Sequence, residues 1–389
     1  MDPEKRNRVA RAKAEMEEKE IDALLVTKPT NIFYLSGFNG IWVSKPEISL
    51  LMLDSEPVLI VPHLWLTRAQ EMSWAKDILP YGDSDDPFDF VRSILEDRKV
   101  DGKSIGIEED FLTVDSHSKL AKKLPEADLV NSSEILRKVR MIKDKDEIGS
   151  IKIAAEIVDE GMLAAVEAVK QRRSEAEICA TAESGMKEMW AKHYPQIEIC
   201  DFVGPESGVY QALSCSVNSG PKIASPTAYG PTGRKVETGD LVQVKLFAVC
   251  NGYHAENERS MAVGKPTDKQ AKGFKTMLEA RRKAGEVMRP GATCSQVARA
   301  AKEVFQDAGY MDALRARAGH GIGLGSHEIP SLREEDKTVL QENMVMCLEP
   351  ALYAKDECEV RFSHSDTLVI TKAGREFLTE YDRGFLIVQ

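Results

Sequence analysis

Ionisable side chains recur at alternate positions on both sides of one predicted turn. Two runs of strand length, 241–249 and 253–263, flank Asn251-Gly252. An Asn-Gly pair is typical of a two-residue hairpin turn, because both turn residues must adopt φ > 0. In this register Lys245 faces Glu258, and strand periodicity places four ionisable groups on one face: Lys245, His254, Glu256 and Glu258. Such a face could carry acid–base chemistry, although a solvated face with a cross-strand Lys–Glu pair would give the same pattern.

A glycine-rich loop with two histidines is the second candidate feature. Residues 319–330 read Gly-His-Gly-Ile-Gly-Leu-Gly-Ser-His-Glu-Ile-Pro and contain His320 and His327. The glycines allow a ligand to approach the backbone closely. Downstream, Glu349 ends an apolar run, and the segment 360–370 adds two more polar candidates: Arg361 and His364.

The elements that position these residues fall into two groups. In the first third of the chain short apolar strands alternate with helices, which predicts an α/β domain. In the remainder, apolar residues at helical spacing predict long helices over about 145–170, 174–191, 267–288 and 294–308, and these are segregated from the strand-like runs, which predicts an α+β domain with an antiparallel sheet. We expect a domain over 1–133, a charged linker helix region over 134–150 and a second domain over 151–389.

Composition excludes several classes of protein. The 389 residues are 42% hydrophobic and 30% charged, and the net charge is −11, which disfavours general binding to nucleic acid or to an anionic membrane. The charged N-terminal segment lacks the apolar core of a signal peptide, and no apolar run is long enough to span a membrane. The seven cysteines lie in the second half without CxxC spacing, so we expect reduced thiols and a cytoplasmic location.

In their order, these segments resemble the creatinase/prolidase/aminopeptidase P family, which has the pita-bread fold. The resemblance covers nearly the whole chain. Besides the loop around His320 and His327, it is carried by Leu-Leu-Val-Thr at 24–27, Asn-Ile-Phe-Tyr-Leu-Ser-Gly-Phe at 31–38, Arg-Met-Ile-Lys at 140–143 and Gly-Asp-Leu-Val at 239–242. It implies a creatinase-like N-terminal α/β domain, a pita-bread catalytic domain, a homodimer and a small-molecule substrate.

The metal ligands that this resemblance implies are only partly present. The metallopeptidases of the family bind two metal ions through Asp, Asp, His, Glu and Glu, and the matching positions here are Lys245, Glu256, His320, Glu349 and Ser365. A charged lysine offers no lone pair and repels a cation. We therefore predict no dinuclear centre and favour no cofactor. The alternative is one divalent metal ion (Mn, Co or Zn) on Glu256, His320 and Glu349.

The activity that we predict follows the creatinase-type members of the family, which cleave a C–N bond without metal. Glu258-Arg259 and Lys45-Pro46 resemble segments of those members, whereas their catalytic His falls here on Ala228. The prediction is a metal-independent hydrolase of an amide or amidine-type C–N bond in a small, zwitterionic substrate. The predicted catalytic residues are His320, His327, Glu258, Glu349, Lys245 and Glu256, and the predicted substrate-binding residues are Tyr229, His254, Arg361, His364 and Lys45.

Three alternatives stay open at this point. An Xaa-Pro dipeptidase or aminopeptidase would use one metal ion or a rearranged pair, and metal-dependent cleavage of an Xaa-Pro dipeptide would identify it. A lyase acting on a small charged osmolyte would use the same fold. A non-catalytic relative that binds a peptide or protein would show the same losses at Lys245 and Ser365.

Overall fold

The chain forms two compact units in the computed structural model, which describes residues 3–40, 45–202, 212–224, 230–310, 317–354 and 360–389. The first unit comprises Met1–Arg140 and Phe202–Tyr210, and the second comprises Met141–Asp201 and Gln211–Gln389. Each unit has its own sheet and its own buried apolar core.

The first unit is a mixed six-stranded sheet covered by helices, as the alternation of strands and helices predicts. The strand order is β4-β3-β2-β1-β5-β6, and β1 pairs antiparallel with β2 but parallel with β5. The strands are β1 Ala23–Val26, β2 Ile48–Met52, β3 Val58–Pro62, β4 Asp77–Tyr81, β5 Ser104–Ile107 and β6 Asp128–Asn131. The helices are α1 Pro3–Glu18, α2 Pro29–Ser36, α3 Leu66–Met72, α4 Pro87–Asp97, α5 Val114–Lys123 and α6 Ser133–Arg140, with a 3-10 turn at His63–Trp65.

The second unit is built on a nine-stranded, mainly antiparallel sheet of order β11-β10-β12-β15-β9-β8-β7, in which β16 also pairs with β15 and β17 with β9. Its strands are β7 Leu213–Ser219, β8 Leu241–Cys250, β9 Tyr253–Val263, β10 Gly319–Gly321, β11 Glu328–Ser331, β12 Val345–Leu348, β15 Ser365–Thr371, β16 Gly374–Phe377 and β17 Leu386–Val388. A separate ribbon joins β13 Leu352–Ala354 to β14 Val360–Phe362. This architecture confirms the predicted fold class of an α/β domain followed by an α+β domain with an antiparallel sheet.

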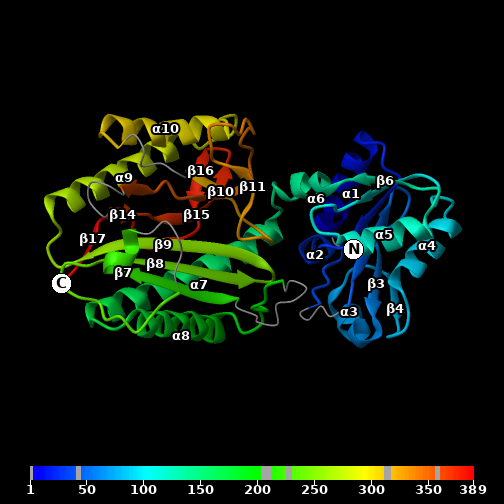
Figure 1. Cartoon of the computed structure of the whole chain (residues 1–389), viewed down its shortest axis with the longest axis horizontal. Helices are drawn as coiled ribbons and strands as arrows, with labels where there is room; N and C mark the ends of the chain where they lie inside the picture. The colour runs from blue at the N-terminus through cyan, green and yellow to red at the C-terminus, as the bar shows by residue number, and fades with distance from the viewer. Residues whose placement is uncertain (1–2, 41–44, 203–211, 225–229, 311–316, 355–359) are drawn as a thin grey trace. The chain divides into compact units, whose positions relative to one another are not determined.

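Four long helices pack on this curled sheet. They are α7 Lys145–Lys170, α8 Glu175–His193, α9 Asp268–Val287 and α10 Cys294–Asp307. In Figure 1, α7 and α8 lie along β7, β8 and β9, and α9 and α10 lie on the side of β14 and β15. Each helix begins with a capping box, in which the side chain of the N-cap residue and that of the third helical residue each bond the other's backbone N–H. These local signals explain why the four helix starts could be placed closely from the sequence.

The hairpin of β8 and β9 has the predicted register. Lys245 pairs with Glu258, and Cys250 pairs with Tyr253 across the turn. Asn251 and Gly252 have φ angles of 48° and 78°, which is the left-handed backbone that this turn requires. The two turn residues therefore set the pairing register of the hairpin, and this register decides which side chains of the two strands lie on the same face.

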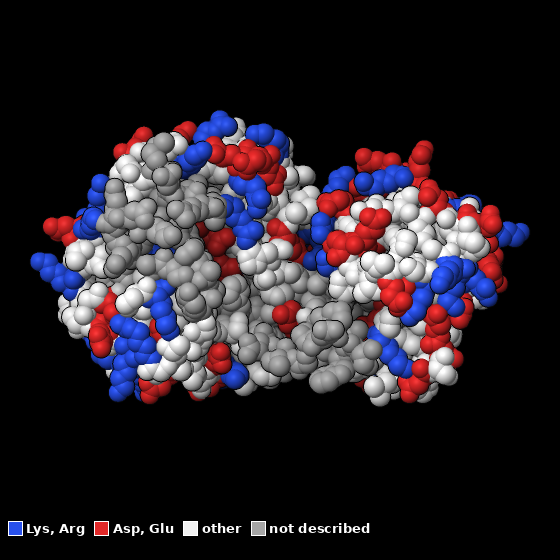
Figure 2. Space-filling view, in the orientation of Figure 1, with Lys and Arg blue, Asp and Glu red and all other residues white. Residues whose placement is uncertain are grey.

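The surface of each unit carries both signs of charge. In Figure 2, Lys and Arg are interspersed with Asp and Glu on the visible face rather than gathered in one patch. Across the described residues, every helix is too short or too polar to cross a membrane.

Candidate functional site

Two rows of side chains cross one face of the sheet in the second unit. In the first row, Cys347 on β12 pairs with Thr367 on β15 and with His320 on β10. Glu256 on β9 continues this row, because its backbone N–H donates to Thr367 Oγ1 at 2.9 Å and the Thr367 hydroxyl donates to its carbonyl at 3.0 Å. Four neighbouring strands therefore bring a carboxylate, a hydroxyl, a thiol and an imidazole into line.

The second row lies two residues further along the same strands. Glu258 on β9 pairs with Lys245 on β8 on one side and with Ser365 on β15 on the other. Glu349 directly follows β12, where its backbone N–H donates to the carbonyl of Ala318 at 2.8 Å. Because side chains alternate along a strand, this row points to the same side of the sheet as the first.

The ionisable groups of the two rows are in contact. His320 Nε2 lies 3.3 Å from Glu349 Oε1 and 3.8 Å from Glu256 Oε2. Lys245 Nζ forms an ion pair with Glu258 Oε1, and the His327 ring stacks on the His320 ring at a centroid distance of 4.2 Å. The structure thus brings together all six residues that the sequence nominated as catalytic: Lys245, Glu256, Glu258, His320, His327 and Glu349.

Crowding of carboxylates in a buried site raises their pKa values. Burial, followed by the charges of Glu349 and Glu258, raises the pKa of Glu256 well above its ordinary value. Burial, followed by the charge of Glu258, raises the pKa of Glu349 to about 7. Arg317 lies 3.5 Å from Glu349 and offsets part of this effect. A proton or a cation between these carboxylates would stabilise the cluster.

The tautomer of His320 is fixed by its own loop. Its Nδ1 atom lies 2.9 Å from the carbonyl oxygen of Gly321, and a carbonyl can only accept, so Nδ1 carries the hydrogen and Nε2 keeps its lone pair. Burial, followed by the charge of His327, lowers the pKa of His320 to about 3. At neutral pH, His320 therefore presents an uncharged Nε2 lone pair to Glu256 and Glu349.

Lys245 is held as an ammonium group. Burial acts to lower the pKa of Lys245, but the charge and hydrogen bond of Glu258 outweigh burial and leave this pKa raised. The other oxygen of Glu258 accepts from Ser363 Oγ at 3.0 Å and from Gln243 Nε2 at 3.3 Å. Burial alone would have favoured a neutral lysine, so the paired carboxylate decides its charge.

The donor set fits a divalent cation. His320 Nε2 and Glu256 Oε1 are buried and have no hydrogen-bond partner among the described residues. At 3.3 Å, His320 Nε2 and the Glu349 oxygen are two facing acceptors whenever Glu349 is ionised, an arrangement that a proton on Glu349 or a metal ion between the two atoms satisfies. Lys245, held as an ammonium group by Glu258, and Ser365 add no carboxylate to this set.

The other predicted residues have different surroundings. His254 lies beside the glycine loop, with its Nδ1 atom 3.0 Å from the Gly323 carbonyl. Arg361 is buried, and its charge acts to lower the pKa of Lys245, which places it near the cluster. His364 is fully buried, with its ring against Phe274 and its Nε2 atom 3.2 Å from the Ser260 carbonyl, so these contacts are those of a core residue.

Of the two remaining predicted substrate-binding residues, Lys45 belongs to the other unit and Tyr229 is not described. Lys45 belongs to the first unit, where it forms an ion pair with Asp83 and donates to the carbonyl of Asp83 at 3.0 Å. Tyr229, like Ala228 beside it, lies outside the described residues.

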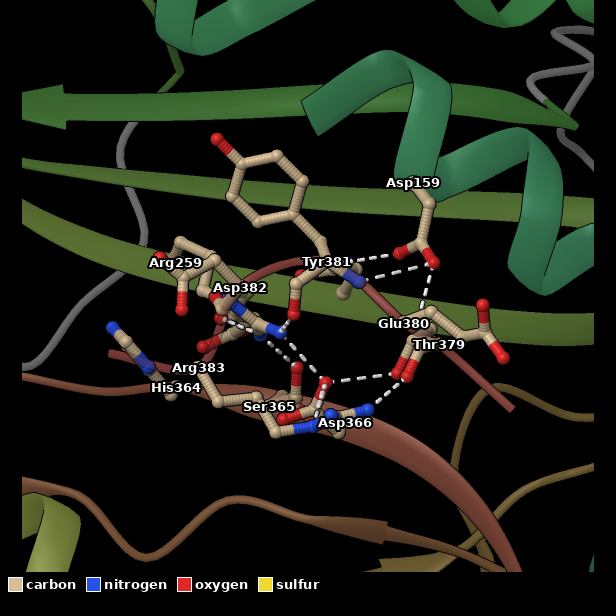
Figure 3. A network of polar contacts seen from close by, with 12 residues as sticks. Asp159, Arg259, His364, Ser365, Asp366, Thr379, Glu380, Tyr381, Asp382 and Arg383 are labelled. Atoms are coloured by element: carbon tan, nitrogen blue, oxygen red, sulfur yellow. Dashed lines mark hydrogen bonds and ion pairs between the residues drawn. The ribbon is translucent and has the colours of Figure 1, made fainter. Parts of the chain in front are cut away.

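A buried network behind the site was missed by sequence reasoning. Asp366 on β15 is fully buried and accepts from Arg259 Nη2 at 2.7 Å, from Arg281 Nη2 and from Thr379 Oγ1 at 2.9 Å. Figure 3 shows this carboxylate at the centre of the network, with Arg259 and Thr379 turned towards it. Arg259 and Asp366 directly follow Glu258 and Ser365, so strand alternation, the signal that placed the hairpin face, also places them on the opposite face.

The same network forms hydrogen bonds to the backbone of the site. Arg259 donates to the carbonyls of Glu258 at 2.8 Å and Ser365 at 2.9 Å. Arg281 on α9 donates to the carbonyls of Leu348 and His364. Glu258 and Ser365 are second-row residues themselves. Leu348 directly precedes Glu349, and His364 directly precedes Ser365. We call Asp366, Arg259, Arg281 and Thr379 the brace.

A second missed contact holds the glycine loop. Lys143 is buried, and its Nζ atom lies 3.1 Å from Glu328 Oε2. The other Glu328 oxygen accepts from the Gly325 backbone N–H at 2.9 Å. A Cβ at Gly323 would lie 2.8 Å from Glu328 and 2.9 Å from Lys143, so glycine allows the loop to close on this ion pair.

Comparison with known proteins was made for both units. The profile described as metallopeptidase family M24 matches residues 149–372, and that of the creatinase/prolidase N-terminal domain matches residues 8–142. The chain is 30% identical over 372 residues to the Xaa-Pro dipeptidase of Pyrococcus furiosus, covering 95% of this chain and 97% of the relative. It is 28% identical over 364 residues to the Xaa-Pro dipeptidase of Lactobacillus delbrueckii subsp. lactis, covering 92% and 93%. The crystal structure of the prolidase from Pyrococcus horikoshii OT3 superposes with a TM-score of 0.82 at 29% identity, over 98% of this chain and 100% of that one.

Proposed function

Because the chain belongs to metallopeptidase family M24 and is a hydrolase of that family, we propose that it cleaves the amide bond of a dipeptide-sized substrate of the Xaa-Pro type with one divalent ion. The observation that carries the proposal is the facing pair of acceptors, His320 Nε2 and Glu349 Oε1, 3.3 Å apart. The similarity to Xaa-Pro dipeptidases over nearly the whole chain supports the substrate class.

This proposal corrects the expectation of no cofactor. Family membership supports a divalent metal, and three buried or half-buried donors are placed to hold one: Glu256, His320 and Glu349. An ion there would polarise the scissile carbonyl and lower the pKa of a water molecule. The predicted loss of the dinuclear centre stays a prediction, supported by the chemistry of Lys245 and Ser365.

The chain's own groups divide the remaining work. Lys245, fixed by Glu258, supplies a positive charge for the oxyanion that develops on the substrate carbonyl. His327 lies at the solvent-accessible end of the glycine loop, and partial desolvation of its ring, followed by the charge of Arg317, lowers its pKa. A neutral imidazole in this place can exchange a proton with the departing nitrogen.

A second candidate is favoured by one specific observation. The ammonium of Lys245 stands at a position where the metallopeptidases that this chain resembles have a carboxylate ligand. In a creatinase-type hydrolase without metal, this fixed charge would stabilise the oxyanion alone. The non-catalytic alternative is set aside by membership of a hydrolase family, and no described contact favours the lyase.

The test is hydrolysis of a panel of Xaa-Pro dipeptides and of matched dipeptides without proline, with a chelator or with added Mn²⁺, Co²⁺ or Zn²⁺. The proposal expects cleavage of Xaa-Pro that the chelator abolishes and one metal restores. Cleavage that survives complete metal removal would favour the second candidate. No cleavage under any condition would contradict both for this substrate class.

Lys245→Asp separates the two candidates further, with Lys152→Asp as the matched surface control, since Lys152 is half-exposed on α7. A new carboxylate at 245 adds a metal ligand, so the proposal expects tighter metal binding in this variant. The second candidate expects activity to be lost with no gain in metal.

A further inference from the structure

One chemically active side chain of the first row has no role in the proposed function. Cys347 is a free cysteine on β12, fully buried between Thr367 and His320 in the sheet. A buried thiol is commonly a small apolar filler, so a role needs independent geometric support.

The first support is the position of the sulfur atom. One donor atom each from Glu256, His320 and Cys347 lies within 4.8 Å of the other two, and all three residues are buried. Strand pairing causes this proximity, since β9, β15, β12 and β10 are consecutive neighbours and the three side chains share one face. The sulfur therefore points into the same cluster as the proposed ligands.

The second support is the set of unsatisfied atoms around it. His320 Nε2 and Glu256 Oε1 are buried without a hydrogen-bond partner among the described residues. The hydroxyl of Thr367, 3.9 Å from the sulfur, already donates to the Glu256 carbonyl. The thiol can thus donate a hydrogen bond to Thr367 Oγ1. His320 Nε2 and Glu256 Oε1 then still lack a partner, which a metal ion bound between them and the sulfur would supply.

We propose that Cys347 Sγ is a ligand of the divalent ion beside Glu256 and His320, and that the centre therefore selects Zn²⁺ or Co²⁺ over Mn²⁺ or Mg²⁺. This inference rests on the proposed single-ion function. Binding forms one metal–sulfur bond, breaks the S–H bond and releases one proton to solvent, with no change of oxidation state.

The chemistry of the donors sets this preference. Carboxylate-only sites suit Mn²⁺ and Mg²⁺, whereas a thiolate with an imidazole suits Zn²⁺. The three donors that lie together are one sulfur, one nitrogen and one carboxylate oxygen, a mixture that zinc accepts with its fourth position open, and Glu349 lies beside them, 3.3 Å from His320. Because Lys245 and Ser365 supply no carboxylate ligand, a larger share of the affinity for the metal ion depends on the sulfur.

The test is the electronic absorption spectrum of the whole protein loaded with one equivalent of Co²⁺. A thiolate bound to Co²⁺ gives a charge-transfer band in the near ultraviolet, separate from the ligand-field bands in the visible that report any bound Co²⁺. The variants are Cys347→Ser and Cys347→Ala, so that one remains if the other does not fold. The matched control is Cys215→Ser, because Cys215 on β7 pairs with Leu246 and its sulfur is near Cys179 of α8, on the other face.

The expected result is both sets of bands in the wild type and in Cys215→Ser, with only the visible bands left in the Cys347 variants. In competition dialysis, the Cys347 variants should also lose the preference for Zn²⁺ over Mn²⁺ by roughly tenfold or more. Visible bands without the charge-transfer band in the wild type would overturn the role of Cys347 and leave the single-ion proposal standing. If the wild type binds no Co²⁺, both proposals fall.

Discussion

The two faces of strands β9 and β15 carry polar groups of opposite character. On the face of the brace, Asp366 has a donor for each oxygen, and Arg259 bonds one carboxylate and four backbone carbonyls. On the face of the site, one residue away in each strand, His320 Nε2 and Glu256 Oε1 lack partners within the described part of the chain. Asn257 Oδ1 on the brace face also lacks a partner within this part of the chain, so the distinguishing feature of the site face is that its unpaired acceptors lie beside further carboxylates, an arrangement that a bound cation would satisfy.

The two faces therefore have different expected roles, with stability on the brace face and chemistry on the site face. The brace fixes the carbonyls of Glu258 and Ser365 from behind, so the second row does not depend on its own contacts for its position. The side chains of the site can then remain under-bonded and crowded at a cost in free energy. We expect substitutions on the brace to lower stability and substitutions on the site to lower activity.

The largest expected effect is that of Asp366→Asn. Removing the charge leaves the guanidinium groups of Arg259 and Arg281 buried without a counter-ion, which costs about 3–5 kcal/mol of the free energy of unfolding. Urea denaturation of the metal-free protein measures this loss. Asp382→Asn, at an exposed position nearby, is the control and should change stability by about 0.5 kcal/mol or less. Equal effects of the two variants would break the comparison.

The counterpart on the site face is His320→Gln. It removes the imidazole lone pair, and we expect kcat/KM to fall by roughly 100-fold or more. Because the imidazole makes no hydrogen bond through Nε2, we expect the free energy of unfolding to change by only about 1 kcal/mol. Steady-state kinetics and urea denaturation on the same sample check both. Near-normal turnover would remove His320 from the mechanism.

Two groups of the site face should make the stability of the metal-free protein depend on pH, in opposite directions. Burial raises the pKa of Glu349 from its ordinary 4.5 to about 7, so the folded metal-free protein binds a proton more tightly than the unfolded chain does. The free energy of unfolding therefore falls as pH rises from about 4.5 to about 7, by an amount on the order of 3 kcal/mol for this group. His320 acts in the opposite direction, because its lowered pKa makes the protein lose stability as pH falls below about 6.5.

Glu349→Gln isolates the contribution of this carboxylate to the pH dependence of the free energy of unfolding. His320 is present in both proteins, so its contribution largely cancels when the two are subtracted. The difference in stability, wild type minus variant, should decrease between pH 4.5 and pH 7 after chelator treatment. A difference that is flat across this range would show that Glu349 titrates normally.

The smallest expected effect is that of Thr379→Val. This change removes one of the hydrogen bonds to Asp366 and keeps the shape of the side chain, which costs about 1 kcal/mol. We expect kcat/KM to stay within about twofold of the wild type, because two arginines still hold the carboxylate. A large loss of activity with little loss of stability would instead place the brace in the chemistry.

Much of the candidate site could be predicted because it depends on local signals. Asn251-Gly252 fixed the register of one hairpin, and period-two alternation then placed Lys245, Glu256 and Glu258 on one face, as found. The glycine-rich loop marked His320 and His327. Strands β8 and β9 and the long helices were located for the same reason, since turns and caps are read from adjacent residues.

The rest depended on pairing between distant segments. Nothing near Asp366 in the sequence reveals that Arg259 and Arg281 converge on it, because β9, α9 and β15 meet only in the folded sheet. The role proposed for Cys347 depends in the same way on β12 lying between β10 and β15 in the sheet. His364 sits in the same polar segment, but it faces Phe274 in the core. The protonation of Lys245 depends on a distant residue as well, because burial lowers its pKa and the ion pair with Glu258 raises it.

Metal stoichiometry tests whether this hydrolase holds the one divalent ion proposed at Glu256, His320 and Glu349. Purified protein would be incubated with Mn²⁺, Co²⁺ and Zn²⁺ in turn, freed of unbound metal and measured by inductively coupled plasma mass spectrometry, beside His320→Gln. The account predicts one ion per chain in the wild type and close to none in the variant. Two ions per chain, or none under every condition, would contradict it.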